Sequence, residues 1–272
     1  MSFTHRRFLL ATTAAALLIA AALPASAAEP ERVEARFEIF GFAGLHLLTN
    51  RTTVQEGGGR YAITTDLNTR GLASAFVDLS SHSEVRGKLA RDAPLPDAYR
   101  ADMRRNGEDR HYGLDYRGDG IVANLSTPPS SDQPVFVAAE QIQGTVDQLT
   151  AFFLLERHLA KHKNCSVVVP VFDGSGLYNL RFTNGKRETL PADRYQNFAG
   201  PTQLCEVVRE EIVANRSKNE DTYSRGRIWY ARLVDGDRMM PVRMEFDTKF
   251  GVVTGYLAEL RGRGVDLHLT RE

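Results

Sequence analysis

Cysteine, tryptophan and surplus charge are scarce in this chain of 272 residues. It contains two cysteines, Cys165 and Cys205, and one tryptophan, Trp229. No Cys-x-x-Cys spacing occurs, which argues against a redox-active pair. Lys+Arg and Asp+Glu both number 34, and this balance argues against a nucleic-acid partner, which normally calls for a basic surface.

The chain also lacks a catalytic or metal-binding motif with the spacing its chemistry requires. Ser175 lies directly between two glycines, whereas the hydrolase elbow is Gly-x-Ser-x-Gly. His158, His162 and Cys165 have the i, i+4, i+7 spacing of three zinc ligands on one helix side. A solvated helix end explains these histidines better, and Cys165 is the expected partner of Cys205. We therefore expect a non-enzymatic protein with no catalytic residue, metal or cofactor.

The N-terminus has the three parts of a cleavable export signal. Arg6 and Arg7 precede the apolar segment Phe8 to Leu23, and Ala25-Ser26-Ala27 offers a cleavage site ahead of Ala28. The apolar segment is shorter than the ~20 residues that comfortably span a bilayer, although an uncleaved anchor is the alternative. We expect residues 1–27 to be a signal peptide and the mature chain to be periplasmic, without a transmembrane segment. General and twin-arginine export both stay open.

In an oxidising compartment, an isolated pair of cysteines most simply forms one disulfide. A bond between Cys165 and Cys205 would stabilise the fold by roughly 4 kcal/mol in the chain-entropy model. Two buried free thiols are the alternative.

Alternation of apolar and polar residues dominates the mature chain. It recurs at residues 33–39, 61–67, 112–116, 178–182 and 242–246. This period is typical of antiparallel strands with one buried face. Three Asx-Gly pairs, Asp119-Gly120, Asn184-Gly185 and Asp235-Gly236, predict hairpin turns between strands.

One helix is well specified, from Thr145 to Lys163. Thr145 and Gln148 have the spacing of a capping box, and cations fill the last turn before Asn164. Its broad apolar face is too large to be left in water and predicts packing against the sheet; it consists of Leu149, Phe152, Phe153, Leu155 and Leu159. A shorter helix or a strand is expected at residues 72–79, and 128–134 is typical of a linker.

These patterns predict a mainly β fold in a single domain, residues 28–272. We expect a strongly curved antiparallel sheet, a half-barrel, packed on one principal helix. Aromatic residues of the C-terminal strands and the helix are either plain core or the lining of an apolar ligand cavity. The residues expected at such a lining are Phe152, Phe153, Phe182, Trp229 and Phe246.

Several short motifs carry a family resemblance, which extends weakly over the whole mature chain. They are Thr145-Val-Asp-Gln-Leu-Thr-Ala151, Cys165, Val171-Phe-Asp-Gly174, Tyr178-Asn-Leu180, Tyr195, Ala199-Gly-Pro201, Cys205, Met240-Pro-Val-Arg243, Glu245-Phe246 and Val252-Val253. In these the chain resembles an exported family known as domain of unknown function 3108. It departs from the family at Gln148, where proline is favoured, and at Ser175-Gly176, where basic residues usually follow.

The resemblance implies an envelope protein whose curved sheet surrounds a helix, similar to periplasmic lipoprotein carriers, and it implies no activity. Fold-level likeness does not establish function. We expect the protein to bind an apolar ligand, a lipid or a lipidated partner. The alternatives are a structural protein that supports envelope integrity through protein contacts, and a hydrolase. Ligand identity, oligomeric state and pathway stay open.

Overall fold

The computed structural model describes residues 30–71, 74, 78–91, 93–117, 122–127, 137–174, 176–213, 224–248 and 251–270. The expected signal peptide, the linker at 128–134, the Asp119-Gly120 turn, Ser175 and most of segment 72–79 lie outside these ranges. The described residues form one large antiparallel sheet of 14 strands, so the mainly β prediction is confirmed. The sheet is open, with β7 at one edge and β8 at the other.

The first half of the sheet is a meander in chain order. Its strands are β1 (Glu31–Phe40), β2 (His46–Gly57), β3 (Arg60–Thr69), β4 (Leu79–Ala90), β5 (Ala93–Arg105), β6 (Glu108–Tyr116) and β7 (Val122–Thr127), with the short 3-10 helix η1 (Phe42–Gly44) after β1. The second half comprises β8 (Val167–Phe172), β9 (Leu177–Leu190), β10 (Gly200–Val213), β11 (Arg225–Ala231), β12 (Met240–Thr248), β13 (Gly251–Gly262) and β14 (Val265–His268). All five strands expected from the alternation are present.

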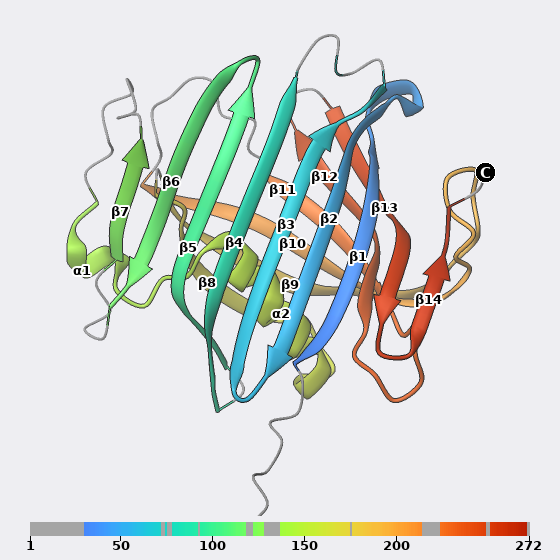
Figure 1. The fold of residues 1–272 in the computed structure, drawn as a ribbon. Coiled ribbons are helices and arrows are strands. Elements are labelled where there is room, and N and C mark those ends of the chain that lie inside the picture. The colour runs from blue at the N-terminus through green and yellow to red at the C-terminus, as the bar shows by residue number, and fades with distance from the viewer. Residues whose placement is uncertain are drawn as a thin grey trace, which may run out of the picture.

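Pairing of β1 with β13 joins the two meanders into one sheet. The chain therefore leaves the first meander at one edge and enters the second at the opposite edge. The connection contains α1 (Ala139–Ile142) and α2 (Gln148–His162). Figure 1 shows α2 lying between the two halves of the sheet, which curve around it.

Helix α2 separates two apolar clusters because its two sides face different halves of the sheet. Leu155 and Leu159 pack with Phe182 and Ile228 of the second meander. Phe153 packs instead with a cluster from the first meander that includes Tyr61, Ile63, Val85 and Leu114. Burial of these side chains is the main driving force for the fold, at roughly 25 cal/mol per Å² of apolar surface.

Helix α2 begins two residues later than a cap at Thr145 requires. Val146 forms a parallel bridge with Val171 of β8, which holds the chain extended up to Asp147. Asp147 is the N-cap, and its carboxylate accepts the backbone N–H of Thr150 at 2.9 Å. The capping box at Thr145 is therefore wrong, because strand pairing outcompetes a local side-chain cap. At the other end Lys163 adopts a left-handed conformation (φ 58°).

The disulfide and one of the predicted Asx-Gly turns are present, whereas a second predicted turn is not. Cys165 and Cys205 are bonded, with their Cα atoms 5.7 Å apart, and the bond joins the segment after α2 to β10. Asp235-Gly236 lies in the turn between β11 and β12, as predicted. The hairpin turn at Asn184-Gly185 is wrong, because β9 continues through it to Leu190.

Asn184 instead pairs with Cys205 of β10, and the residues after it, Gly185 and Lys186, form a bulge opposite Leu204, where the register shifts. Its side chain has a structural task, since Asn184 accepts the backbone N–H of Cys165 at 2.8 Å. A Cβ at Gly185 would lie 2.5 Å from the side chain of Leu204. The pair therefore permits close packing within a strand rather than a reversal of the chain.

Candidate functional site

Four of the five aromatic residues predicted to line a cavity lie on the helix side of the sheet, packed into the core. The rings of Phe152 and Phe182 are 5.8 Å apart, and Phe153 lies 5.1 Å from the ring of Tyr61. Phe246 is partly buried and packs against the same cluster as Phe182. A cavity lining at these positions stays a prediction.

Trp229 lies on the opposite face of the sheet from those phenylalanines. It pairs in register with Leu204, whereas its neighbour Ile228 pairs with Cys205 and faces the α2 cluster. The indole N–H donates to the Glu188 carboxylate at 2.6 Å, and the guanidinium of Arg243 lies 5.1 Å from the ring. The structure therefore does not bring Trp229 together with the helix phenylalanines.

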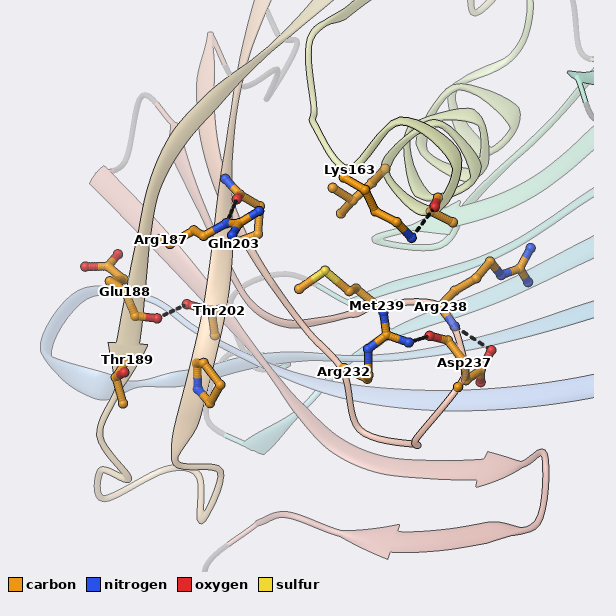
Figure 2. A pocket seen from close by; sticks show the side chains of 14 residues that line it. Lys163, Arg187, Glu188, Thr189, Thr202, Gln203, Arg232, Asp237, Arg238 and Met239 are labelled. Atoms are coloured by element: carbon orange, nitrogen blue, oxygen red, sulfur yellow. Dashed lines mark hydrogen bonds between the residues drawn. The ribbon is translucent and has the colours of Figure 1, made fainter.

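A cavity of about 600 Å³ opens beyond the C-terminal end of α2, between the helix and strands β9 and β10. Figure 2 shows it from close by, with Lys163 on the helix side and Arg187 and Gln203 on the strand side. Its walls combine the helix end, the two strands and the turn from β11 to β12. They comprise Leu159, Ala160, Lys163, Arg187, Glu188, Thr189, Pro201, Thr202, Gln203, Arg232, Gly236, Asp237, Arg238 and Met239.

The inner wall of this cavity is apolar and continuous with the core. Leu159 is buried and Met239 partly buried, and both pack with the cluster that contains Leu155, Phe182 and Ile228. Met239 thus contacts both the cavity and the apolar interior. Methionine is unbranched and flexible, so its side chain can change rotamer more readily than a branched one.

The rim of the cavity is cationic. Lys163 Nζ donates to the Ala160 carbonyl at 2.6 Å, Arg187 Nε donates to Gln203 Oε1 at 3.2 Å, and Arg232 donates to the Asp237 carbonyl. Each of these three cations has only neutral partners among the described residues. Neither carboxylate of the wall offsets them.

Both of those carboxylates are engaged elsewhere. Figure 2 shows Glu188 pointing away from the cavity, and its side chain binds Trp229 and Lys186. These two donors lower the pKa of the Glu188 carboxyl. Arg263 Nη1 donates to both carboxylate oxygens of Asp237, at 2.7 and 2.8 Å. The cavity therefore combines an apolar back with a rim of uncompensated positive charge.

An ion network anchored on Glu56 of β2 supports the wall next to α2. The Glu56 carboxylate binds Arg157 of α2 at 2.6 Å and receives two bonds from Arg238 of the β11–β12 turn. Arg263, between β13 and β14, lies 3.6 Å away. This network, with Glu56 13% exposed, fixes four segments distant in sequence around the helix.

Glu156 of α2 lies beside this network in a less favourable setting. Burial raises the pKa of its carboxyl to about 7, and the negative charge of Glu56 adds to the effect, whereas Arg238 and Arg263 oppose it. Asp147, the buried N-cap, also has a raised pKa because of desolvation, against the bonds from Thr150. Asp147 caps α2 and Glu156 lies within it, so both carboxylates belong to the helix that the sheet curves around (Figure 1).

The cavity residues escaped the sequence reasoning. Lys163, Arg187, Arg232 and Met239 come from separate elements, and no spacing or motif links them. Lys163 was noted only as a helix-end cation. The sequence offers no signal for them, since segments 187–194 and 232–238 each contain two arginines and two acidic residues.

The described ranges contain neither a metal-binding cluster nor a membrane-spanning helix. Within these ranges, no group of three or more His, Cys, Asp or Glu side chains is arranged to hold a metal ion. Cys165 is unavailable as a ligand because it is bonded to Cys205, and His158 contacts Asn164 at 3.3 Å. Among the same residues, no helix is both long and apolar enough to cross a bilayer.

Comparison with known proteins gives a family. The model of the family described as "Protein of unknown function (DUF3108)" matches residues 36–258. Among solved structures, a beta-barrel-like protein of domain of unknown function DUF1849 from Brucella abortus is similar at 12% identity and a TM-score of 0.49, over 87% of this chain and 99% of that one. No curated protein matches. The match to the family model covers most of the chain, and the protein belongs to the DUF3108 family.

Proposed function

We propose that the protein is an exported, non-enzymatic cell-envelope protein that binds a lipid or a lipid-modified partner at the open end of its half-barrel. The observation that carries the proposal is the cavity at the end of α2, whose apolar back is continuous with the core. Its volume of about 600 Å³ falls within the usual range of ligand pockets, roughly 300–1,000 Å³.

In this proposal an alkyl chain enters past Met239. The side chain turns aside, and the chain inserts between α2 and the second meander, toward Phe182 and Phe246. Partly buried apolar residues pack against the cluster that the chain would enter, among them Phe152, Met244 and Phe246. Each buried methylene would contribute about 0.8 kcal/mol.

Titration with a single-chain lipid tests the proposal. Trp229 is the only tryptophan in the chain. Its indole N–H donates to Glu188, a residue that lines the cavity. We expect a saturable change in its fluorescence. Native mass spectrometry of protein prepared without detergent should show co-purified lipid.

A polar substitution at the entrance sharpens the test. Met239→Gln keeps the size and charge but hydrates the route, so we expect lipid affinity to fall about four- to fifteenfold, equivalent to losing one or two methylene contacts. Met103→Gln is the matched control, a partly exposed methionine on β5 away from the cavity. Equal affinities of the two variants, or no lipid binding by the native protein, would refute the proposal.

The structural alternative has its own support in the packing of the interior. Tyr178, Leu155, Phe182 and Ile228 are all almost completely buried, so much of the concave face is filled by the protein's own side chains. An envelope-integrity protein acting through protein contacts would need no cavity. It is favoured if no lipid binds while cells lacking the protein show envelope defects.

Export is the second part of the proposal, motivated by the N-terminal signal. The mature protein should be recovered from the periplasm with an intact mass that begins at Ala28, give or take a residue. A recovered chain that retains Leu9 to Leu23 would contradict cleavage.

A further inference from the structure

We infer that the ligand of the α2-end cavity carries an anionic headgroup, a phosphate or a carboxylate, held by Lys163, Arg187 and Arg232. This inference rests on the proposed lipid-binding function and adds the ligand's charge. It comes from the distribution of charge around the cavity, not from its volume.

The three rim cations keep most of their N–H donors for a ligand. Within the described part of the chain, each of the three side chains makes one hydrogen bond, and each of those bonds goes to a carbonyl or amide oxygen. An ammonium has three N–H donors and a guanidinium five, so most donors of the rim remain for another acceptor.

Arg238, the fourth cation of the cavity wall, differs from the three rim cations in its partner. Arg238 is neutralised by two bonds to Glu56, although it lines the same space. Asp237 is likewise committed to Arg263. Among the residues that the structure describes, the charges at the helix wall are therefore paired internally, whereas those of the rim have no carboxylate partner.

The three rim cations lie on different sides of the cavity opening. They come from the C-terminal end of α2, from β9 and from the β11–β12 turn, so they surround the opening on three sides. Leu159 and Met239 line the same cavity and are more buried than these cations. An anion held at the rim would direct an attached alkyl chain inward, and charge-assisted hydrogen bonds are about twice as strong as neutral ones.

Three probes that share parts separate the sources of affinity. A single-chain lysophosphatidic acid has both the phosphate and the chain, the matching monoacylglycerol lacks the phosphate, and glycerol phosphate lacks the chain. We expect the lysophosphatidic acid to bind at least about tenfold more tightly than either of the others, with an affinity that falls as salt is raised.

A triple variant tests the residues. Lys163→Gln, Arg187→Gln and Arg232→Gln together should reduce the affinity for lysophosphatidic acid to that for the monoacylglycerol, while monoacylglycerol binding stays within about twofold. Because each side chain is exposed, the variant should fold, and its thermal midpoint checks this. The matched control removes three exposed cations of the first meander, Arg86, Lys88 and Arg110, and should leave both affinities unchanged.

The outcomes are distinct. Equal binding of lysophosphatidic acid and monoacylglycerol overturns the anionic headgroup and leaves the lipid-binding proposal standing. Binding of none of the probes overturns both. Glycerol phosphate binding as tightly as the lysolipid overturns the inference as well, because the site would then hold a soluble anion without a chain. An equal loss of affinity in the control triple would assign the effect to overall charge and refute the role of the rim.

Discussion

Replacement of Glu56 by glutamine should destabilise the protein far more than the loss of an ordinary surface charge. The Glu56 carboxylate faces Arg157, Arg238 and Arg263, which come from α2 and from the β11–β12 and β13–β14 turns. The substitution keeps the shape of the side chain and removes its charge. Three guanidinium groups are then left facing a neutral amide.

The magnitude follows from the burial of these groups. Breaking one partner of a fully buried ion pair costs about 3–5 kcal/mol. Here the four side chains keep between 12% and 19% of their exposure, and Asp237 still compensates Arg263. We therefore expect a loss of about 2–4 kcal/mol, which lowers Tm by roughly 5–12 °C in a domain of this size.

Thermal unfolding followed by circular dichroism measures the effect. The control is Glu34→Gln on β1, whose partner Arg32 is 56% exposed and whose pair should contribute less than about 1 kcal/mol. Adding Arg238→Met to Glu56→Gln should recover part of the lost stability, since one unpaired charge is removed. If Glu56→Gln and Glu34→Gln shift Tm equally, the network does not hold the four segments together.

Three further changes test other parts of the fold. Cys205→Ser should lower stability by about 2–4 kcal/mol in thermal unfolding; two freely alkylatable thiols in the native exported protein would contradict the bond. Glu156 has a folded pKa of about 7, above its ordinary value of 4.5, so stability should fall as pH rises from about 5 to 7. Glu156→Gln should remove that decline and stabilise the protein at pH 8; an unchanged pH profile would refute it. Asp147→Ala should cost about 1–3 kcal/mol in denaturant titration and Asp147→Asn less; equal losses would show that the cap bond to Thr150 is unimportant.

The five strands expected from the alternation were predictable because each of them places apolar side chains in the core. Residues 33–39 alternate strictly, and Val33, Ala35 and Phe37 are all buried in β1. The same rule cannot say which side of the sheet carries the helix, so the alternation alone does not show that Trp229 and Phe182 face opposite sides. The face of the sheet that carries Trp229 is also buried, and Trp229 packs there with Leu204, Val242 and Leu257. A large aromatic residue reports burial, but it does not report which face is buried.

Local signals failed where longer-range pairing was stronger. Thr145 has the sequence of a cap, yet the bridge between Val146 and Val171 fixes the chain as extended. Asn184-Gly185 has the sequence of a hairpin turn, yet β9 pairs with β10 on both sides of it. In both cases the competing partner lies more than 15 residues away, so a short window cannot reveal it. Asp235-Gly236 meets no such competition, and its turn forms as predicted.

The position of the cavity follows from the lengths of the elements that surround it. Helix α2 has 15 residues and spans about 22 Å at ~1.5 Å per residue. Strands β9 and β10 have 14 residues each, which at ~3.3 Å per residue reach about 46 Å. The helix therefore covers only part of the concave face. Beyond Lys163 the strands line the cavity instead, where Thr202 and Gln203 are buried and Arg187 is exposed. Long cations such as Arg187 suit that position, since their stems cover apolar surface while their charges stay hydrated. An open end with an apolar back and a cationic rim is thus a consequence of a short helix inside long strands.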